Sequence, residues 1–261
     1  MSVPLCILDL VSISEGATAR DGIAASMESA RLADRLGYSR LWFAEHHNTP
    51  NLASSATSLL ISQAATVTER IRVGSGGVML PNHAPLMVAE QYGTLANIHG
   101  DRIDLGLGRA PGTDGITAYA MRRSREALSA DDYPEQLAEL FAFDEENFPP
   151  DHPFRSIRAI PFDVRMPPVW ILGSSPWSSA LAASNGLPYS FAGHINGAGA
   201  VSALRSYRAN FVPSARLERP LSMLAVSVTI GETPEHAEAL PQINKLMLVR
   251  LHQSFTDRLY P

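Results

Sequence analysis

Two histidines and a glutamate stand together in the run AEHHN, where Glu45 is followed by His46 and His47. Histidine is the side chain whose ordinary pKa lies closest to neutral pH, so this run could transfer protons. Neighbouring side chains of an extended chain point to opposite sides, which predicts that His46 and His47 do not face the same centre. A metal site would need further ligands, and the sequence has neither an H-E-x-x-H pattern nor a cysteine pair to supply them. The alternative is that both imidazoles only make hydrogen bonds within a loop.

A second run, VGSGGVMLPN, contains Gly76 and Gly77 among three glycines in four positions. Glycines at this density permit a positive φ, a bulge, or the close approach of a flat ligand to bare backbone. The run therefore predicts either a ligand contact or a tight rim of the fold.

Arginine appears in a third run, DLGLGRAPG, where Arg109 follows a glycine-rich apolar stretch. A guanidinium group is permanently charged and can donate two parallel hydrogen bonds to a phosphate. The alternative is a structural ion pair with an acid such as Asp104 or Asp114.

The fourth run, LGSSPWSS, places Gly173, Ser174 and Ser175 immediately before a predicted helix. Free backbone N–H groups and the helix dipole make such a helix start a favourable place for an anion. The alternative is ordinary capping of the helix by Ser175 or Ser178. Taken with Arg109, the run predicts one phosphate held between two neighbouring strands.

The elements that position these runs alternate between short apolar strands and longer stretches with helical spacing. The predicted strands are Val3–Leu10, Arg40–Ala44, Ile71–Gly74, Ile103–Gly108, Val169–Leu172, Tyr189–Ala192 and Ser222–Ile230. The predicted helices run from near Thr18 to Gly37, over Ser54–Val67, Pro85–Asn97, Ser178–Asn185 and Gly199–Asn210, and from Pro234.

An insertion at about 110–167 interrupts this alternation, because a connection of roughly 60 residues far exceeds an ordinary βα loop. Helices are predicted over Ile116–Leu128 and Tyr133–Ala142. The proline-rich stretch Asn147–Pro168 is predicted to be extended or irregular.

Seven parallel strands fit either an open doubly wound sheet or a (β/α)8 barrel. The first strand is followed by DLVSISEGATAR, which lacks the G-x-G-x-x-G turn of a dinucleotide-binding sheet, so the barrel is favoured. All four runs follow predicted strands, and a barrel collects its active site at those strand ends. We therefore predict a single barrel domain, 1–261, that lacks its last strand; a further helix is predicted near Leu240 to His252.

Composition excludes several classes of partner. The 261-residue chain has a net charge of -5 at pH 7, which argues against nucleic acid. No apolar stretch approaches the roughly 20 residues needed to span a bilayer, so no membrane insertion is expected. The single cysteine, Cys6, and a start without a secretory signal predict a reducing, cytoplasmic location.

Taken together, four segments resemble a known family in its order and spacing: LWFAEHHN, IRVGSGGVMLPNHAPLMVAEQ, GDRIDLGLGRAPG and PVWILGSSPWSSALAASNGLP. The chain is similar to the bacterial luciferase-like flavin-dependent monooxygenases, in their non-luminescent branch. The resemblance implies a TIM-type (β/α)8 barrel that binds reduced FMN at its C-terminal mouth. It also implies a separate flavin reductase, molecular oxygen and a small organic substrate as partners, and a homodimer.

The resemblance further implies roles for individual residues. His46 would face the flavin and assist catalysis. A non-proline peptide bond, often cis, would lie against the flavin ring at the third strand end. The residues that would contact the cofactor are Gly76, Gly77, Arg109, Gly173, Ser174 and Ser175.

Family members usually continue into an eighth strand and a last helix, which this chain is predicted to lack. An unclosed barrel exposes unpaired strand edges, so a partner chain, a rearrangement or a longer natural chain would have to cover them. Two other functions therefore stay open: a non-catalytic or degenerate flavin-binding protein, and a deazaflavin-dependent oxidoreductase.

Overall fold

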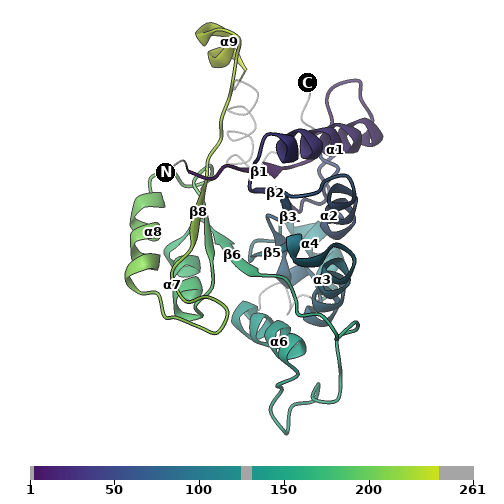
Figure 1. Ribbon diagram of the computed structural model, residues 1–261, viewed down its shortest axis with the longest axis vertical. Coiled ribbons are helices and arrows are strands. Elements are labelled where there is room, and N and C mark those ends of the chain that lie inside the picture. Colours follow the sequence, from purple (N-terminus) through teal and green to yellow (C-terminus); the bar gives the residue numbers. More distant parts are fainter. Residues whose placement is uncertain (1–2, 125–130, 241–261) are drawn as a thin grey trace.

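The computed structural model describes residues 3–124 and 131–240, which fold around one curved parallel sheet (Figure 1). The strands are β1 (Cys6–Asp9), β2 (Arg40–Phe43), β3 (Arg72–Ser75), β4 (Val78–Met79), β5 (Ile103–Gly108), β6 (Val169–Gly173), β7 (Tyr189–Ala192) and β8 (Ser222–Ala225). The helices are α1 (Ala19–Arg35), α2 (Thr57–Thr66), α3 (Pro85–His99), α4 (Gly115–Arg122), α6 (Tyr133–Glu145), α7 (Pro176–Ser184), α8 (Ala200–Ala209) and α9 (Pro234–Ala239). Two 3₁₀ helices, η1 (Leu80–Asn82) and η2 (Gly100–Arg102), flank α3.

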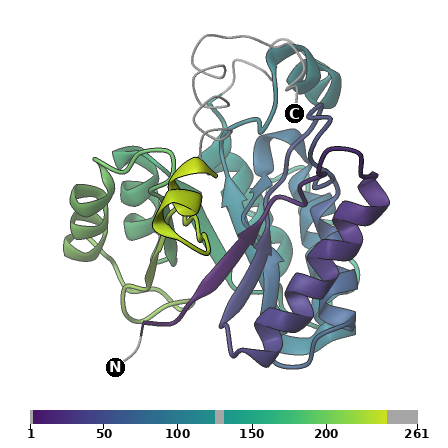
Figure 2. The same cartoon turned by 90° about the horizontal axis from the view of Figure 1, so that it is seen from above.

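Every pair of neighbouring strands in the sheet is parallel. The neighbours follow the order β1, β2, β3, β5, β6, β7, β8, and the short β4 also pairs with β5. Parallel neighbours need crossover connections, and the helices that supply them lie outside the curved sheet (Figures 1 and 2). This architecture confirms the predicted barrel-type fold.

The two outer strands, β1 and β8, approach each other at one point. The sulfur atom of Cys6 lies 3.7 Å from that of Met223. No strand pairing joins β1 to β8 within residues 3–124 and 131–240. The barrel is therefore nearly closed in the described part of the chain.

Helix α1 shows how the local sequence produces the predicted elements. The Thr18 hydroxyl accepts a hydrogen bond from the amide of Asp21, and the Asp21 carboxylate accepts one from the amide of Thr18. This reciprocal pair satisfies N–H groups that would otherwise lack partners at the helix start. The buried face carries Met27, Ala30 and Ala33, as the helical spacing predicts.

Strands β3 and β5 lie unusually close together near the C-terminal end of the barrel. The Ser75 hydroxyl donates to the carbonyl of Gly106 at 2.9 Å, and the amide of Gly106 donates back to this hydroxyl at 3.0 Å. A Cβ atom on Gly106 would overlap the Ser75 carbonyl oxygen. Glycine is thus required here by backbone approach, immediately below the predicted site.

The N-terminal end of the barrel is held by the fully buried carboxylate of Asp104. It accepts hydrogen bonds from Arg40 Nε at 3.0 Å, Trp42 Nε1 at 3.1 Å and Arg72 Nε at 2.9 Å. These partners belong to β2 and β3, and Asp104 belongs to β5. One carboxylate therefore ties three strands together at the end opposite the predicted site.

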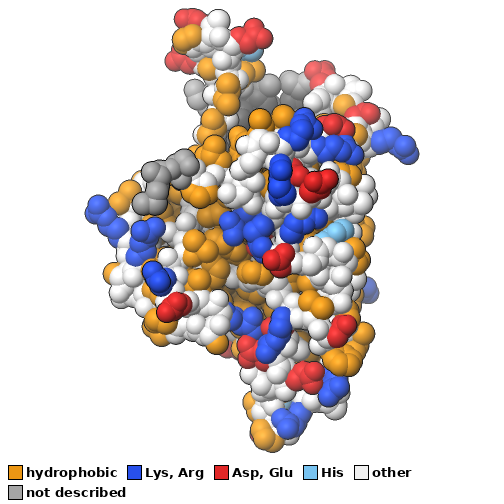
Figure 3. Space-filling model, in the orientation of Figure 1, with side chains coloured by type: hydrophobic (Ala, Val, Ile, Leu, Met, Phe, Trp, Pro, Cys, Tyr) orange, Lys and Arg blue, Asp and Glu red, His pale blue; other side chains and the backbone are white. Residues whose placement is uncertain are grey.

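The last predicted strand, Ser222–Ile230, was too long, because β8 ends at Ala225. The chain continues as an arm that leads away from the barrel to α9 (Figure 1). Apolar side chains follow β8 and this arm on the surface (Figure 3), and Val226, Val228 and Ile230 are exposed. The alternating apolar pattern thus continues where no neighbouring strand pairs with the chain in the described residues.

The segment between β5 and β6 contains two helices and then irregular chain. Helix α4 covers the first part of the predicted helix Ile116–Leu128, and residues 125–130 lie outside the described residues. Helix α6 begins at the predicted residue, Tyr133. The predicted helix near Leu240 to His252 falls outside the described residues after its first residue. Within the described ranges, no helix is long and apolar enough to cross a bilayer.

Candidate functional site

The loops that follow four neighbouring strands bring the predicted site residues to one rim of the barrel. His46 lies shortly after β2, Gly76 and Gly77 follow β3, Arg109 follows β5, and Ser174 follows β6. Because these strands are parallel and adjacent in this order, their C-terminal ends lie side by side. The rim thus combines a candidate proton-transfer group, a glycine pair, a cation and a helix start.

His46 has a ring nitrogen, Nδ1, that is buried without a hydrogen-bond partner in the described part of the protein. Burial lowers the pKa of His46; the charge of Glu45 opposes this shift, and His47 adds to it. The imidazole is therefore neutral at pH 7. A buried ring nitrogen without a protein partner is suited to a hydrogen bond or proton exchange with a bound molecule.

Glu45 and His47 are hydrogen-bonded to each other. The Glu45 carboxylate is 1% exposed and accepts a hydrogen bond from His47 Nε2 at 2.8 Å. It also accepts hydrogen bonds from His83 Nε2 and the amide of Met79. His46 takes part in none of these bonds, which agrees with the prediction that the two histidines face different centres. No group of three His, Cys, Asp or Glu side chains in the described ranges is arranged to hold a metal ion.

The peptide bond between Gly76 and Gly77 is cis. A Cβ atom on Gly76 would meet the side chains of Leu8 and Trp42, and one on Gly77 would lie 2.7 Å from the Gly106 carbonyl oxygen. Close packing at the barrel mouth is therefore enough to require both glycines. Their contact with a flavin ring stays a prediction.

Arg109 lies over the indole ring of Trp177, with its Cζ atom 4.2 Å from the ring centroid. Its Nη1 atom is 3.4 Å from the carboxylate of Asp131, and these two side chains are 48% and 74% exposed. A long ion pair between exposed groups contributes little to stability. The described ion pairs of Arg109 do not include Asp104 or Asp114, the two acids considered as structural partners.

The start of α7 lies beside Arg109. Ser175 is its N-cap residue, and its hydroxyl accepts a weak hydrogen bond of 3.5 Å from the amide of Ser178. The carbonyl of Ser174 accepts a hydrogen bond from Asn196 Nδ2 at 2.9 Å. A Cβ atom on Gly173 would overlap the side chain of Ser178. Ser175 thus caps the helix, and the contact of Gly173, Ser174 and Ser175 with a cofactor stays a prediction.

Tyr133 adds an unpartnered donor to this region. Its ring packs edge-on against Trp177, with centroids 5.8 Å apart, and its buried hydroxyl has no hydrogen-bond partner in the described residues. Burial raises the pKa of Tyr133, and the charge of Arg109 opposes the shift only in part, so the hydroxyl keeps its proton. A cation, a helix start and an unpartnered O–H donor suit a phosphate. The residues present therefore fit a phosphate-bearing cofactor.

Sequence reasoning assigned no role to His83, Trp177 or Tyr133. His83 lies shortly after the glycine pair, and Trp177 lies in the same SSPWSS run as Ser175, so their position in the sequence could have pointed to them. Nothing local marks Tyr133, because only the fold brings α6 beside α7.

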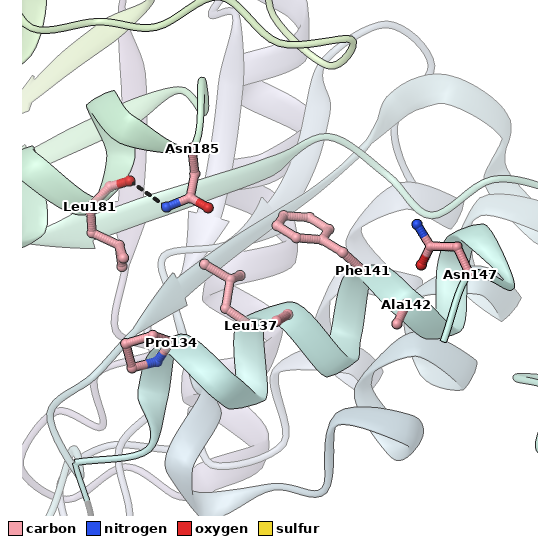
Figure 4. Close-up of a pocket in the computed structure, with 8 residues that line it drawn as sticks. Pro134, Leu137, Phe141, Ala142, Asn147, Leu181 and Asn185 are labelled. Atoms are coloured by element: carbon pink, nitrogen blue, oxygen red, sulfur yellow. Dashed lines mark hydrogen bonds between the residues drawn. The ribbon is translucent and has the colours of Figure 1, made fainter. Parts of the chain in front are cut away.

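The surface has two grooves whose linings include none of the predicted site residues. The first, about 280 Å³, lies between α6 and α7 (Figure 4). Its lining is Pro134, Leu137, Ala138, Phe141, Ala142, Asn147, Leu181 and Asn185. The second, about 260 Å³, lies between α3, the end of α6 and residues 159–166. Neither contains a predicted site residue, so the candidate site is defined by its chemistry rather than by these grooves.

Comparison with known proteins shows that the chain is similar to luciferase-like monooxygenases over nearly its whole length. The family model described as Luciferase-like monooxygenase matches residues 3–256. A curated protein from Escherichia coli (strain K12), named Luciferase-like monooxygenase, is 44% identical over 260 residues. The alignment covers 100% of this chain and 76% of that protein.

Solved structures show the same fold. The crystal structure of apo-MsnO8 matches with a TM-score of 0.89 and 38% identity, covering 100% of this chain and 76% of that one. The oxygenating constituent of 3,6-diketocamphane monooxygenase from Pseudomonas putida, in complex with FMN, matches with a TM-score of 0.71 and 18% identity. That match covers 97% of this chain and 76% of the other, and at this identity it concerns the fold alone.

Proposed function

Because this chain belongs to the luciferase-like monooxygenase family, we propose that it uses reduced FMN and molecular oxygen to oxidise a small organic substrate. A separate flavin reductase supplies the reduced FMN, since the first strand is not followed by a nicotinamide-binding G-x-G-x-x-G turn. The working unit is a homodimer.

One observation carries this proposal. His46, the glycine pair, Arg109 and the start of α7 occupy one rim, in the order of four adjacent strands. The rim also holds a buried, unpartnered nitrogen on His46 and a buried, unpartnered hydroxyl on Tyr133. A ligand with a polar ring at one end and a phosphate at the other could form hydrogen bonds with both groups.

At the phosphate end, Arg109 and the start of α7 would bind the anion. The stacking of Arg109 on Trp177 holds the guanidinium beside Ser175 before any ligand arrives. This preorganisation reduces the entropy lost on binding. Ser174, Ser175 and Tyr133 would donate hydrogen bonds, and Gly173 would let the ligand approach the backbone.

At the ring end, Gly76 and Gly77 would present bare backbone to the flat face of the flavin. Reduced FMN, when bound, supplies the electrons that activate oxygen. The protein's own part is to orient the ring, exclude water and move a proton. His46 is placed for the last task, because its neutral imidazole has a free Nδ1 atom at the same rim.

Cofactor binding gives the first test. Anaerobic calorimetric titration with the reduced forms of FMN, riboflavin and the deazaflavin cofactor should show tightest binding of FMN. Preference for the deazaflavin would instead select a hydride-transfer oxidoreductase. Failure of all three to bind would refute the proposal.

Turnover gives the second test, with His46→Ala as the variant. With a flavin reductase, NADH, FMN and a panel of small thioethers and ketones, mass spectrometry should detect one oxygen atom from ¹⁸O₂ in a product. The variant should bind FMN normally and turn over about 100 to 10,000 times more slowly, the usual range for loss of an acid–base group. FMN binding without oxygen transfer by the wild type would select a non-catalytic flavin-binding protein.

A further inference from the structure

The buried carboxylate of Glu45 connects two loops of the candidate site. Its Oε1 atom accepts hydrogen bonds from His47 Nε2 at 2.8 Å and His83 Nε2 at 2.9 Å. Its Oε2 atom accepts one from the amide of Met79 at 2.9 Å, and His83 Nε2 lies 3.0 Å from the same oxygen. Burying a carboxylate is costly unless it is fully paired, and these contacts provide the pairing.

On the β2 side, Glu45 holds the turn that carries His46. Glu45 and His47 are two residues apart and bonded to each other, so they share one side of the chain, and His46 between them faces the other. The backbone of His47 is held in turn by the loop after Arg109. Its amide donates to the carbonyl of Gly112 at 3.3 Å, and its carbonyl accepts from the Thr113 hydroxyl at 3.0 Å.

On the β3 side, Glu45 holds the segment that follows the glycine pair. Met79 ends β4, two residues after Gly77, and His83 follows η1. Both bonds from this segment end on the Glu45 carboxylate. Beside the backbone bond from the Gly76 amide to the Phe43 carbonyl, at 2.7 Å, the Glu45 side chain therefore forms a second link between the His46 turn and the segment after the glycine pair.

We propose that Glu45 is a positioning residue, which fixes the imidazole of His46 relative to Gly76 and Gly77 through its bonds to His47, His83 and Met79. This inference rests on the proposed function, because it assigns to Glu45 the alignment of a proton-transfer group with the flavin ring. Because Glu45 is 1% exposed, it would act through these partners rather than by contact with a ligand. A carboxylate that only stabilised the fold would affect the unfolding midpoint and leave His46 unmoved.

The variant that tests this role is Glu45→Gln. Gln has a single acceptor oxygen, so in either orientation of the amide it cannot accept from His47, His83 and the amide of Met79 together, as the carboxylate does. Glu28→Gln is the matched control, because the Glu28 side chain is 73% exposed on α1. Should Glu45→Gln fail to fold, His83→Ala removes one of the bonds and leaves the carboxylate paired with His47.

The first readout needs no cofactor. The ring proton resonance of His46, assigned by its loss in His46→Ala, is recorded by NMR in the protein without FMN. We expect it to shift or split both in Glu45→Gln and in His83→Ala, which keeps the charge of Glu45, and to stay in place in Glu28→Gln. Glu45→Gln also removes a charge that acts on His46, whereas His83→Ala leaves that charge in place. An unchanged His46 resonance in His83→Ala would therefore overturn the positioning role, whether or not the protein binds FMN.

The second readout is a double-mutant cycle on turnover. We expect Glu45→Gln to lower kcat by about 10- to 100-fold, the range expected for misplacement of a reacting group. In the His46→Ala background, the same substitution should lower kcat less than about twofold, because the group that it positions is gone. If the double variant lost kcat by the product of the two single effects, the proposal would be overturned. A wild-type protein that binds no FMN would refute the proposed function, and the NMR result would still decide the role of Glu45.

Discussion

The two ends of the barrel each contain a buried carboxylate that ties neighbouring strands together. At the N-terminal end, Asp104 on β5 accepts hydrogen bonds from Arg40, Arg72 and Trp42. At the C-terminal end, Glu45 accepts them from two imidazoles and a backbone amide. The geometry is similar, and the chemistry of the partners differs.

The difference is whether the partners can change charge. The guanidinium groups of Arg40 and Arg72 are charged at every pH that a folded protein meets, so the Asp104 end has a constant charge. At the other end, burial lowers the pKa of His46, next to Glu45, so this end contains a group that exchanges its proton below neutral pH. The buried carboxylate beside the candidate site is thus paired with histidines, and the one at the opposite end is paired with guanidinium groups. This arrangement separates the candidate site from the arginine pairs that stabilise the other end of the barrel.

The largest effect that would test this separation is expected from Asp104→Ala. The substitution leaves Arg40 and Arg72 without their shared carboxylate, and removal of one partner from a buried ion pair is strongly destabilising. Because these arginine side chains are 22% and 25% exposed, we expect a loss of about 3 kcal/mol in the free energy of unfolding, the lower end of the usual range. Urea unfolding at pH 7 measures it.

The same variant should bind FMN with an affinity within about twofold of the wild type when folded, if the two ends are independent. Glu28→Ala, at an exposed carboxylate, is the control and should change stability by less than about 0.5 kcal/mol. A loss of FMN affinity well beyond twofold in the folded variant would show that the two ends are coupled.

An intermediate effect is expected from Arg109→Ala. Unlike Arg40 and Arg72, Arg109 is half exposed, and its one ion pair among the described residues is long, so its charge is available to a ligand. Loss of a charge-assisted hydrogen bond should weaken FMN binding by about 10- to 100-fold and riboflavin binding by less than twofold, since riboflavin has no phosphate.

Arg70→Ala is the matched control for this experiment, because the Arg70 side chain is 72% exposed and lies before β3, at the opposite end of the barrel. It should leave both affinities unchanged. Calorimetry with the two flavins separates the cases, and equal losses for FMN and riboflavin would show that Arg109 does not contact the phosphate.

The strands could be predicted where apolar runs have clear limits. Ile103–Gly108 and Tyr189–Ala192 match the structure at both ends, because each is a buried run flanked by polar or helix-breaking residues. The last strand was extended too far, since the apolar alternation after Ala225 continues without a strand to pair with it in the described residues. A strand needs a partner, and a single sequence does not show where the partner ends.

The rim residues could be placed because each follows a strand, and parallel strands share a C-terminal end. The contacts among these side chains could not be predicted from the sequence. Trp177 under Arg109 and Tyr133 against Trp177 join three segments that are distant in the sequence. The role of Glu45 was equally hidden, because His83 lies 38 residues away and only the pairing of β4 with β5 brings its segment to the rim.

The smallest effect is expected from pH, and it should arise at the Glu45 end. Burial lowers the pKa of His46, so the unfolded chain binds this proton more readily, and stability should decline as the pH falls below the ordinary value of 6.5. Burial alone would raise the pKa of Glu45, but the hydrogen bond and charge of His83, with the bonds from His47 and Met79, lower it overall.

The stability that Glu45 contributes is therefore complete above its ordinary pKa of 4.5 and is lost as the pH falls through the lower folded value. Urea unfolding of the wild type between about pH 7.5 and 3.5 should show both declines. His46→Ala should remove the first. Glu45→Gln should remove the second and keep or enlarge the first, because the charge of Glu45 opposes the lowering of the His46 pKa. A Glu45→Gln variant that loses stability in acid as steeply as the wild type would place the acid-sensitive group elsewhere, and the contrast between a constant and a titratable end of the barrel would fail.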